Sequence, residues 1–301
     1  MSTLNLRKQR FNNLVDYYNV TKLEEMIGFW VIPGNLLNDL RRSMGTYIAK
    51  SLHFEYTEDE DKFLERLETR REDRVNVTPN GAVVPKKEYC IEYNAYIKAY
   101  SDIIRELVKN NPGYLSKVRM TPNVRIKFAN ELEDNYGRPL NTSFPHTDAW
   151  LEGPWGIICH IPVFGDNDNN YLRFYKVKNE SNFSDDLLGI AENFESMQWT
   201  LDYYEPISKK PIKNCINFCD YALLHETVRL ENAKTRISMD FTLYFGDYDV
   251  LPSRQPEYLS KIPRIGEDTF VKISSSEKEN FKERKNALYH YSYGTIDYIS
   301  I

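Results

Sequence analysis

Two residues near the middle of the chain have the types and the spacing of metal ligands. The stretch FPHTDAW, residues 144–150, places His146 and Asp148 one residue apart. Side chains at positions i and i+2 of an extended strand point to the same side, so an imidazole nitrogen and a carboxylate oxygen can reach one ion. Because a His-x-Asp pair also arises by chance, it predicts a metal site only together with a further ligand elsewhere.

His225 is the candidate for that further ligand. It ends the apolar run NCINFCDYALLH, and Arg236 opens the next strand-like run, RISMDFTLYF. Two histidines and one carboxylate on one face of an ion form the facial triad of non-haem Fe(II) oxygenases. An Arg beyond such a metal can bind the distal carboxylate of a chelating co-substrate through two hydrogen bonds, and the hydroxyl of Ser238 can add a third.

Each of these residues also has a structural interpretation. Arg236 could instead form a surface ion pair with Glu226 or Glu231. A strand hydroxyl such as Ser238 is often merely tolerated. His160, in GIICHIPVF, has no acidic residue at ligand spacing, which favours a buried strand histidine with satisfied hydrogen bonds over a third imidazole ligand.

The elements that must position these residues change in character along the chain. Helical patterns fill the first third: residues 33–52 begin with Pro-Gly and carry apolar residues at helical spacing, and residues 57–73 open with Thr57 as a candidate N-cap. The longest helical pattern, residues 86–114, ends at Asn-Pro-Gly. A charged helix is expected in SEKENFKERKNAL, residues 276–288.

From about residue 118 the sequence predicts strands. The candidate segments are short, β-branched and aromatic, and polar turns such as GDNDNN separate them. They are VRIKFA, GIICHIPVF, NYLRFYKV, NCINFCDYALLH and RISMDFTLYF. Strands without intervening helices favour an antiparallel sandwich or barrel with helices packed on it, hence an α+β fold.

Composition excludes several classes of function. The 301 residues carry a net charge of −5, with no Lys/Arg block flanked by aromatic residues, so we expect neither a nucleic-acid partner nor a membrane surface. No apolar run suggests a signal peptide or a membrane span. Four scattered cysteines indicate a reduced, cytoplasmic protein, and the C-x3-C spacing in KNCINFCD is better explained by core packing than by zinc.

The combination of His-Thr-Asp, a distal histidine, and Arg-x-Ser after ten intervening residues resembles the Fe(II)/2-oxoglutarate-dependent oxygenases. The match spans residues 118–250, and it is similar to the phytanoyl-CoA-hydroxylase-like branch. The tract from HTDAWLEGPWG to NYLRFYK also resembles oxygenases of the streptomycin-biosynthesis type. The resemblance implies a double-stranded β-helix, also called a jelly roll or cupin-like fold, buttressed by N-terminal helices.

Under this resemblance the chain is one oxygenase domain, residues 1–301. Residues 1–115 would be mainly helical, residues 116–250 would form the jelly-roll core, and residues 251–301 would be a C-terminal extension. His146, Asp148 and His225 would hold Fe(II). Arg236 would bind 2-oxoglutarate, with Thr227 and Ser238 close to the same carboxylate.

Further residues are candidates for substrate or co-substrate contacts. Arg125 and Lys127 alternate with apolar residues, so both can point into the β core, where a cation needs an anionic partner. A solvent-facing sheet explains them equally well. Asn170 and Arg173, on the strand at the GDNDNN turn, are further candidates for contacts with the substrate or co-substrate. Trp150 could stack on a substrate ring or pack in the core.

The resemblance implies oxidation of a C–H bond by O2 with 2-oxoglutarate as co-substrate, giving hydroxylation, dehydrogenation or epimerisation. Retention of Asp148 disfavours halogenation, because related halogenases replace this carboxylate. The expected substrate is a small polar metabolite, such as a sugar, nucleotide-sugar or aminocyclitol in a biosynthetic pathway. Two alternatives stay open: an oxygenase of an amino acid or acyl thioester, and a non-catalytic jelly-roll module that binds carbohydrate. Oligomeric state is not predicted.

Overall fold

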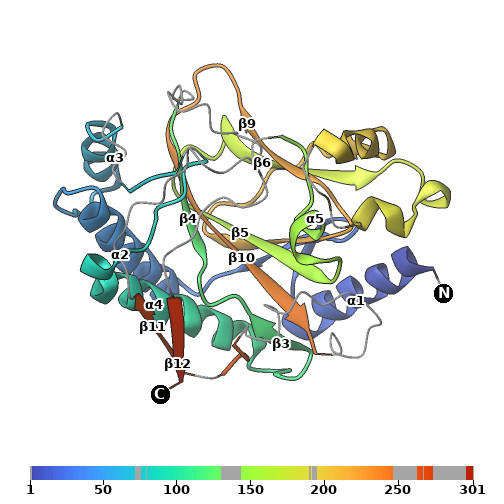
Figure 1. The fold of residues 1–301 in the computed structure, drawn as a ribbon, viewed down its shortest axis with the longest axis horizontal. Helices are drawn as coiled ribbons and strands as arrows, with labels where there is room; N and C mark the ends of the chain where they lie inside the picture. The colour runs from blue at the N-terminus through green and yellow to red at the C-terminus, as the bar shows by residue number, and fades with distance from the viewer. Residues whose placement is uncertain are drawn as a thin grey trace.

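The computed structural model describes residues 2–71, 76–78, 80–129, 144–189, 191, 195–246, 263–266, 268–273 and 296–300. Its helices are α1 (Thr3–Tyr18), α2 (Gly34–Ser51), α3 (Glu60–Glu68), α4 (Cys90–Val108) and the short α5 (Ala149–Glu152). Single 3-10 turns or short 3-10 helices cover Lys87–Tyr89, Glu180–Asn182, Asp185–Leu188 and Glu195–Tyr203. With the antiparallel sheets described next, these elements make an α+β fold, as the sequence predicts (Figure 1).

A seven-stranded antiparallel sheet, called here the large sheet, forms the centre of the molecule. Its strands are β1 (Thr21–Glu24), β2 (Ile27–Val31), β8 (Cys215–Asp220), β5 (Gly156–Gly165), β10 (Arg236–Phe245), β3 (Leu115–Val118) and β4 (Asn123–Lys127). The order is β1-β2-β8-β5-β10, and β3 and β4 both pair with the edge of β10 that is opposite β5. Strands far apart in the sequence therefore become neighbours around β10 and β5.

A three-stranded antiparallel sheet, the small sheet, lies above the large one in Figure 1. Its strands are β7 (Tyr204–Pro206), β6 (Asn170–Val177) and β9 (His225–Arg229), in the order β7-β6-β9. β11 (Thr269–Ile273) and β12 (Ile296–Ser300) form a separate pair. This pair is joined to α4 by Asn94, which donates to the carbonyl of Val271 and accepts from its amide.

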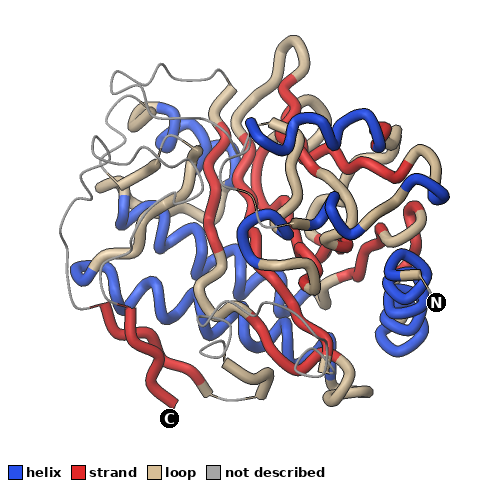
Figure 2. Tube along the Cα trace, turned by 45° about the vertical axis from the view of Figure 1, so that its right-hand side comes forward, coloured by secondary structure: helices blue, strands red, loops and turns tan. Residues whose placement is uncertain are grey.

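Alternation along β10 gives the large sheet two unlike faces. The apolar set on one face is Ile237, Met239, Phe241 and Leu243. The polar set on the other face is Arg236, Ser238, Asp240 and Thr242. Phe241 packs edge-on against Tyr100 of α4 with ring centroids 4.9 Å apart, so the helices cover the apolar face. The polar face, called the inner face below, points away from them, and Figure 2 shows α2 and α4 on the outside of the strands.

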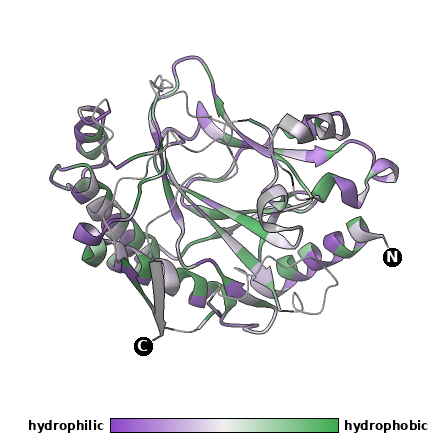
Figure 3. Ribbon diagram, viewed as in Figure 1, coloured by the Kyte–Doolittle hydropathy of each residue, from purple (hydrophilic) through white to green (hydrophobic). Residues whose placement is uncertain are grey.

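The strand sequences explain this burial. Every residue of β8 and all of β5 up to Phe164 are buried, and β5 is almost continuously hydrophobic in Figure 3. The helices show mixed colours in the same view because only one side of each packs inward. Cys159, Cys215 and Cys219 are buried free thiols in these strands, which confirms core packing rather than a zinc site for the C-x3-C pair.

The first third of the chain is less purely helical than the sequence suggested. β1 and β2 follow α1, and β2 pairs with β8, extending the large sheet. α3 begins at Glu60 with Asp59, not Thr57, as its N-cap; the Asp59 side chain accepts from the Lys62 amide. The helix expected at residues 276–288 lies outside the described residues. Within the described ranges, no helix is both long and apolar enough to cross a bilayer.

α1 is attached to the large sheet through a buried ion pair. Arg7 donates to Asp220, at the end of β8, over 2.7 Å, and both side chains are 1% exposed. Arg7 also donates to the carbonyl of Pro154 and lies over the ring of Trp155, 4.4 Å from its centroid. Asp220 Oδ1 further accepts from the Ala222 amide. The pair therefore fixes the turn that follows β8 as well as α1.

Replacing Arg7 by Met should destabilise the protein by ~3–5 kcal/mol, because it leaves the Asp220 carboxylate buried without its cation. Urea unfolding measures this free energy. Arg42→Met is the matched control, since Arg42 pairs with Asp39 at an exposed site and its loss should leave the unfolding midpoint unchanged. Equal midpoints for Arg7→Met and Arg42→Met would contradict this account of α1.

Candidate metal centre

The two histidines of the predicted triad face each other across a backbone pair. The amide of His146 donates to the carbonyl of His225 over 3.0 Å, and the His225 amide donates to the His146 carbonyl over 2.8 Å. This reciprocal pair is an isolated antiparallel bridge at the start of β9. Residues directly opposite in such a bridge point to the same side, and the two ring centroids are 4.3 Å apart.

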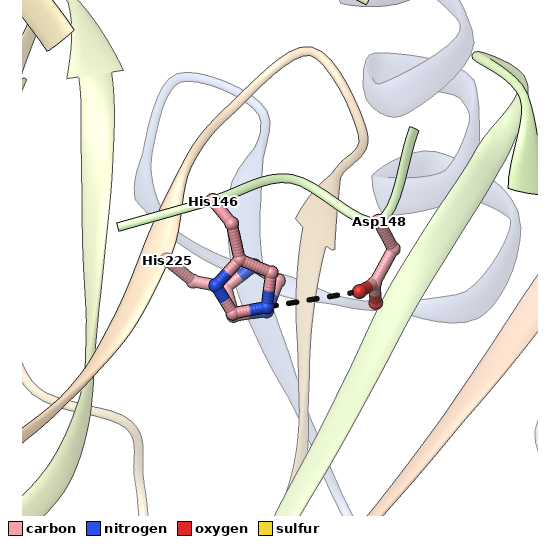
Figure 4. Close-up of side chains that lie close together, drawn as sticks. All are labelled: His146, Asp148 and His225. Atoms are coloured by element: carbon pink, nitrogen blue, oxygen red, sulfur yellow. Dashed lines mark ion pairs between the residues drawn. The ribbon is translucent and has the colours of Figure 1, made fainter. Parts of the chain in front are cut away.

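Asp148 completes the group (Figure 4). One nitrogen of each imidazole and one carboxylate oxygen all lie within 4.8 Å of one another. His146 Nε2 is 3.9 Å from Asp148 Oδ1, which is too long for a hydrogen bond. Small side-chain rotations would let one ion contact all three at bond lengths of ~2.0–2.2 Å. The structure therefore brings together the three residues that the sequence selected, and they could hold a metal ion.

Thr147, the residue between His146 and Asp148, anchors this segment. Its Oγ1 donates to the carbonyl of Tyr221 over 2.6 Å and accepts from the Ala149 amide over 3.1 Å. The Tyr221 hydroxyl is 2.8 Å from Thr242 Oγ1, on the inner face of the large sheet. The segment that carries His146 and Asp148 is thus tied to the turn after β8, and it faces the polar side of β10.

The surroundings keep both imidazoles neutral. Burial lowers the pKa of His146 to about 4, against the hydrogen bond to Phe144, and the positive charges of Arg125 and Lys127 lower it further. Burial and the neighbouring His146 hold the pKa of His225 well below its ordinary value. His146 Nδ1 lies 2.6 Å from the Phe144 carbonyl, which can only accept, so Nδ1 carries the proton. Nε2 is therefore the bare nitrogen that a metal requires.

Arg236 is a buried cation that the described residues satisfy only in part. Its side chain is 1% exposed, and neither Nε nor Nη1 has a hydrogen-bond partner among the described residues. The alternative of a surface ion pair with Glu226 or Glu231 is wrong, because Arg236 is buried. Glu226 binds Arg173 and the Tyr175 hydroxyl instead. Burial lowers the pKa of Arg236 to about 10, which leaves it charged at neutral pH. An unpaired buried guanidinium is costly, so this site favours an anionic ligand.

The neighbours of Arg236 on the inner face are also polar. Ser238 is fully buried and its Oγ has no hydrogen-bond partner in the described part of the chain. Lys127 is opposite Arg236 in the β4-β10 register and is 4% exposed. Its pKa is held well below the ordinary value, first by burial and then by the charges of Arg125, Arg229 and Arg236. The sequence alternative that Lys127 lies on a solvent-facing sheet is therefore wrong.

Thr227 and Asn170 lie on the face of the small sheet that carries His225. Thr227 is two residues beyond His225 and partly buried, opposite Leu172 of β6. Asn170 is fully buried, and its Nδ2 donates to the carbonyls of Lys127 and Lys234. Asn170 therefore links the small sheet to the end of β4, and its Oδ1 has no hydrogen-bond partner within the described part of the chain.

Two candidate substrate residues are not brought to the triad. Trp150 is fully buried and its Nε1 donates to the carbonyl of Leu187 over 3.0 Å, so it packs in the core. Arg173 alternates with Leu172 and Phe174, and Phe174 is opposite His225; Arg173 thus points to the other face of the small sheet, where it pairs with Glu226. The fold, rather than a ligand, accounts for both residues.

Asp240 lies among polar side chains whose contacts the sequence did not predict. This carboxylate binds His160 Nδ1 over 3.0 Å and accepts from Arg125 Nε. The pattern Arg-x-Ser-x-Asp in RISMD was a usable signal, because it places Arg236, Ser238 and Asp240 on one strand face. The partnership with His160 could not be seen in the sequence, because it depends on the register between β5 and β10.

Removing one candidate ligand should greatly weaken metal binding without unfolding the chain. Asp148→Ala should lower the affinity for Fe(II), or for Co(II) as a spectroscopic substitute, by at least about 100-fold, since the ion loses its only charged ligand. Equilibrium dialysis under anaerobic conditions measures the loss. The exposed histidine variant His53→Asn is the control. Unchanged affinity in Asp148→Ala would exclude the triad as the site.

Thr147→Val should weaken the metal site indirectly. It removes the hydrogen bond to Tyr221 that orients the segment between the two ligands, and losses of this kind reduce metal affinity by about 10–100-fold. Thr46→Val, at a partly buried position of α2 away from the triad, is the matched control. The same dialysis measurement applies, and wild-type affinity in Thr147→Val would show that Tyr221 does not position the ligands.

No family model and no curated protein matches the sequence. Among solved structures, the non-heme alpha-ketoglutarate-dependent carbocyclase SnoK from nogalamycin biosynthesis matches with a TM-score of 0.47 and 9% identity, over 84% of this chain and 91% of that one. The epimerase SnoN, also alpha-ketoglutarate-dependent, matches with a TM-score of 0.40 and 11% identity, over 85% of this chain and 99% of SnoN.

AviO1 from Streptomyces viridochromogenes Tue57 matches with a TM-score of 0.42 and 13% identity, over 85% of this chain and 99% of AviO1. Similarities this low do not by themselves establish what the chain does.

Proposed function

We propose that this chain is an Fe(II)- and 2-oxoglutarate-dependent oxygenase. The observation that carries the proposal is the combination of a His-Asp-His group with a buried guanidinium, Arg236, whose Nε and Nη1 have no hydrogen-bond partner among the described residues. Either feature alone has a structural explanation. Together they fit a metal ion and an anionic co-substrate that reaches from it to Arg236.

We also infer that the core is a double-stranded β-helix. The strand order β4-β10-β5-β8 in the large sheet and the order β9-β6-β7 in the small sheet support it. The bridge between His146 and His225 adds a fourth element to the small sheet, on the free side of β9. Two antiparallel sheets of four, with chain connections passing between them, are the arrangement of a jelly roll. β1, β2 and β3 would be additions to the large sheet.

The donor set fits Fe(II). Two neutral imidazoles and one carboxylate are the ligands of the facial triad, which leaves coordination positions for a co-substrate and O2. The bound Fe(II) would supply the activation of O2 that oxidises a substrate C–H bond while 2-oxoglutarate becomes succinate and CO2. The chain itself would orient the ligands through Phe144 and Thr147 and keep bulk water from the buried interior.

Arg236 fits the distal carboxylate of 2-oxoglutarate. Its Nε and Nη1 have no hydrogen-bond partner among the described residues and can donate to an anion, and the neighbouring Ser238 hydroxyl offers another donor. Thr227, on the His225 side, is a further candidate contact. An anion here would offset the cost of burying Arg236, and Lys127 opposite it strengthens the preference for negative charge.

For the substrate we propose a small polar metabolite, with a sugar, nucleotide-sugar or aminocyclitol as the first class to test. This finer assignment follows from the sequence resemblance to streptomycin-biosynthesis-type oxygenases. The polar residues of the inner face, Arg125 and Asp240 among them, are compatible with a hydrophilic substrate. Amino acids and acyl thioesters form the alternative class.

The decisive experiment measures succinate formation from 2-oxoglutarate by the purified protein with Fe(II), O2 and a panel from these classes. We expect iron-dependent turnover that at least one class stimulates, and its loss in His146→Ala and Asp148→Ala. A folded wild-type chain that neither binds Fe(II) nor converts 2-oxoglutarate would instead be a non-catalytic module. Binding of carbohydrate by that chain would then identify the module.

Arg236→Leu should raise the KM for 2-oxoglutarate by about 100-fold or more, because a hydrogen-bonded charge pair contributes ~2–5 kcal/mol to binding at a buried site. The KM for the stimulating substrate should change far less. Arg173→Leu, at an ion pair on the other face of the small sheet, is the matched control. Equal KM values for 2-oxoglutarate in wild type and Arg236→Leu would remove the co-substrate assignment.

A further inference from the structure

His160 is a buried histidine outside the triad. It lies in the middle of β5, is fully buried, and belongs to the inner face of the large sheet. In the strand register it is opposite Asp240 of β10 on one side and Asn217 of β8 on the other. It therefore shares a face with Arg236 and Ser238, the residues proposed above for the co-substrate.

Asp240 fixes the orientation of this imidazole. Its Oδ1 is 3.0 Å from His160 Nδ1, and its other oxygen accepts from Arg125 Nε. Burial opposes ionisation of Asp240, but the charge of Arg125 and the hydrogen bond from His160 outweigh it and lower the pKa of this carboxyl far below its usual range. An ionised carboxylate only accepts, so His160 Nδ1 donates to it.

The second nitrogen of His160 is left open. Nε2 is buried and has no hydrogen-bond partner among the described residues. Burial lowers the pKa of His160, although Asp240 opposes that shift, so the ring is neutral and Nε2 is an acceptor. A buried acceptor left unsatisfied costs ~1–3 kcal/mol, which favours a ligand that donates a hydrogen bond to it.

The position of His160 separates it from the Arg236 end of the inner face. Arg236 and Asp240 are four residues apart on β10, which is about 13 Å at ~3.3 Å per residue. Thr242, the next inner-face residue after Asp240, is bonded to the hydroxyl of Tyr221. The carbonyl of Tyr221 in turn holds Thr147, between His146 and Asp148, so the His160–Asp240 pair lies toward the triad end of the inner face. 2-Oxoglutarate presents only acceptor oxygens when ionised, so it cannot satisfy Nε2.

We propose that His160 is a specificity residue whose Nε2 accepts a hydrogen bond from a hydroxyl or amine of the substrate beside the triad. This inference rests on the proposed oxygenase function and narrows its substrate to molecules that present such a donor. Asp240 and Arg125 are positioning residues for the ring. Among polar metabolites, sugars and aminocyclitols carry suitable donors on most of their carbons.

The protonation of His160 gives the first test. In the Zn(II)- and 2-oxoglutarate-loaded protein, 15N NMR of the five histidines should show His160 protonated at Nδ1 and bare at Nε2, with the signal identified by its absence in His160→Gln. Zn(II) serves as a diamagnetic substitute for Fe(II). A proton on Nε2 would overturn the proposal, because that nitrogen would then donate to a substrate or co-substrate oxygen.

Kinetics give the second test, with glucose, UDP-glucose, streptamine, L-proline and acetyl-CoA as probes of stimulated succinate formation. For a stimulating probe, His160→Phe should raise KM by about tenfold, the loss of one buried hydrogen bond. The KM for 2-oxoglutarate and unstimulated turnover should stay within about twofold, a limit well below that expected loss. His160→Gln, which keeps an acceptor, should recover part of the effect, and His53→Asn should behave as wild type.

Three outcomes are distinguishable. Loss of probe affinity with intact co-substrate affinity supports the role of His160. An unchanged KM for the probe overturns it and leaves Nε2 with an ordered water, whereas a raised KM for 2-oxoglutarate overturns it by assigning His160 to the co-substrate. Failure of the proposed function appears instead in the wild type, as absence of iron-dependent turnover. When no probe stimulates the wild type, the protonation state of His160 seen by NMR is the test of its proposed role.

Discussion

The reciprocal backbone pair between His146 and His225 is the interaction on which the candidate site depends. Two hydrogen bonds align residues that are distant in the sequence, and the geometry of an antiparallel bridge then directs both imidazoles to one side. Asp148 joins them because Thr147 fixes the intervening turn on Tyr221. Three ligands thus converge through backbone pairing and one hydroxyl, while the side chains need only small adjustments to receive an ion.

The large sheet contributes a second constraint on the site, because one of its faces is apolar and the other is polar. One face is apolar and packs on the helices, where it stabilises the fold. The inner face buries cations and hydrogen-bonding groups that the described chain satisfies only in part, Arg236 and Ser238 among them. Burial of unpaired polar groups costs stability, so a ligand that pairs with them recovers that cost on binding.

Sequence reasoning succeeded where a feature depends on local spacing. The apolar faces of residues 33–52 and 86–114 correspond to α2 and α4, and the strand runs correspond to β4, β5, β6, β8 with β9, and β10. It failed where burial or pairing depends on neighbours from elsewhere. Trp150 is a core residue held by Leu187, and Arg173 turns away to Glu226. β2 joins the large sheet by pairing with the edge of β8, and β1 pairs with β2.

His-Thr-Asp, the distal His225 and Arg-x-Ser were sufficient, as sequence, to select the three candidate ligands and the candidate anion-binding residue. The reason is that strand alternation makes the relative facing of i and i+2 a local property. Which strands meet, and in which register, is not local. Only the tertiary structure placed His146 opposite His225, and set His160 against Asp240 with one nitrogen open. It also buried Arg236 with two donor nitrogens that the described residues leave unsatisfied. A shift of one residue in any of these pairings would reverse the faces, so register decides the chemistry that residue types only permit.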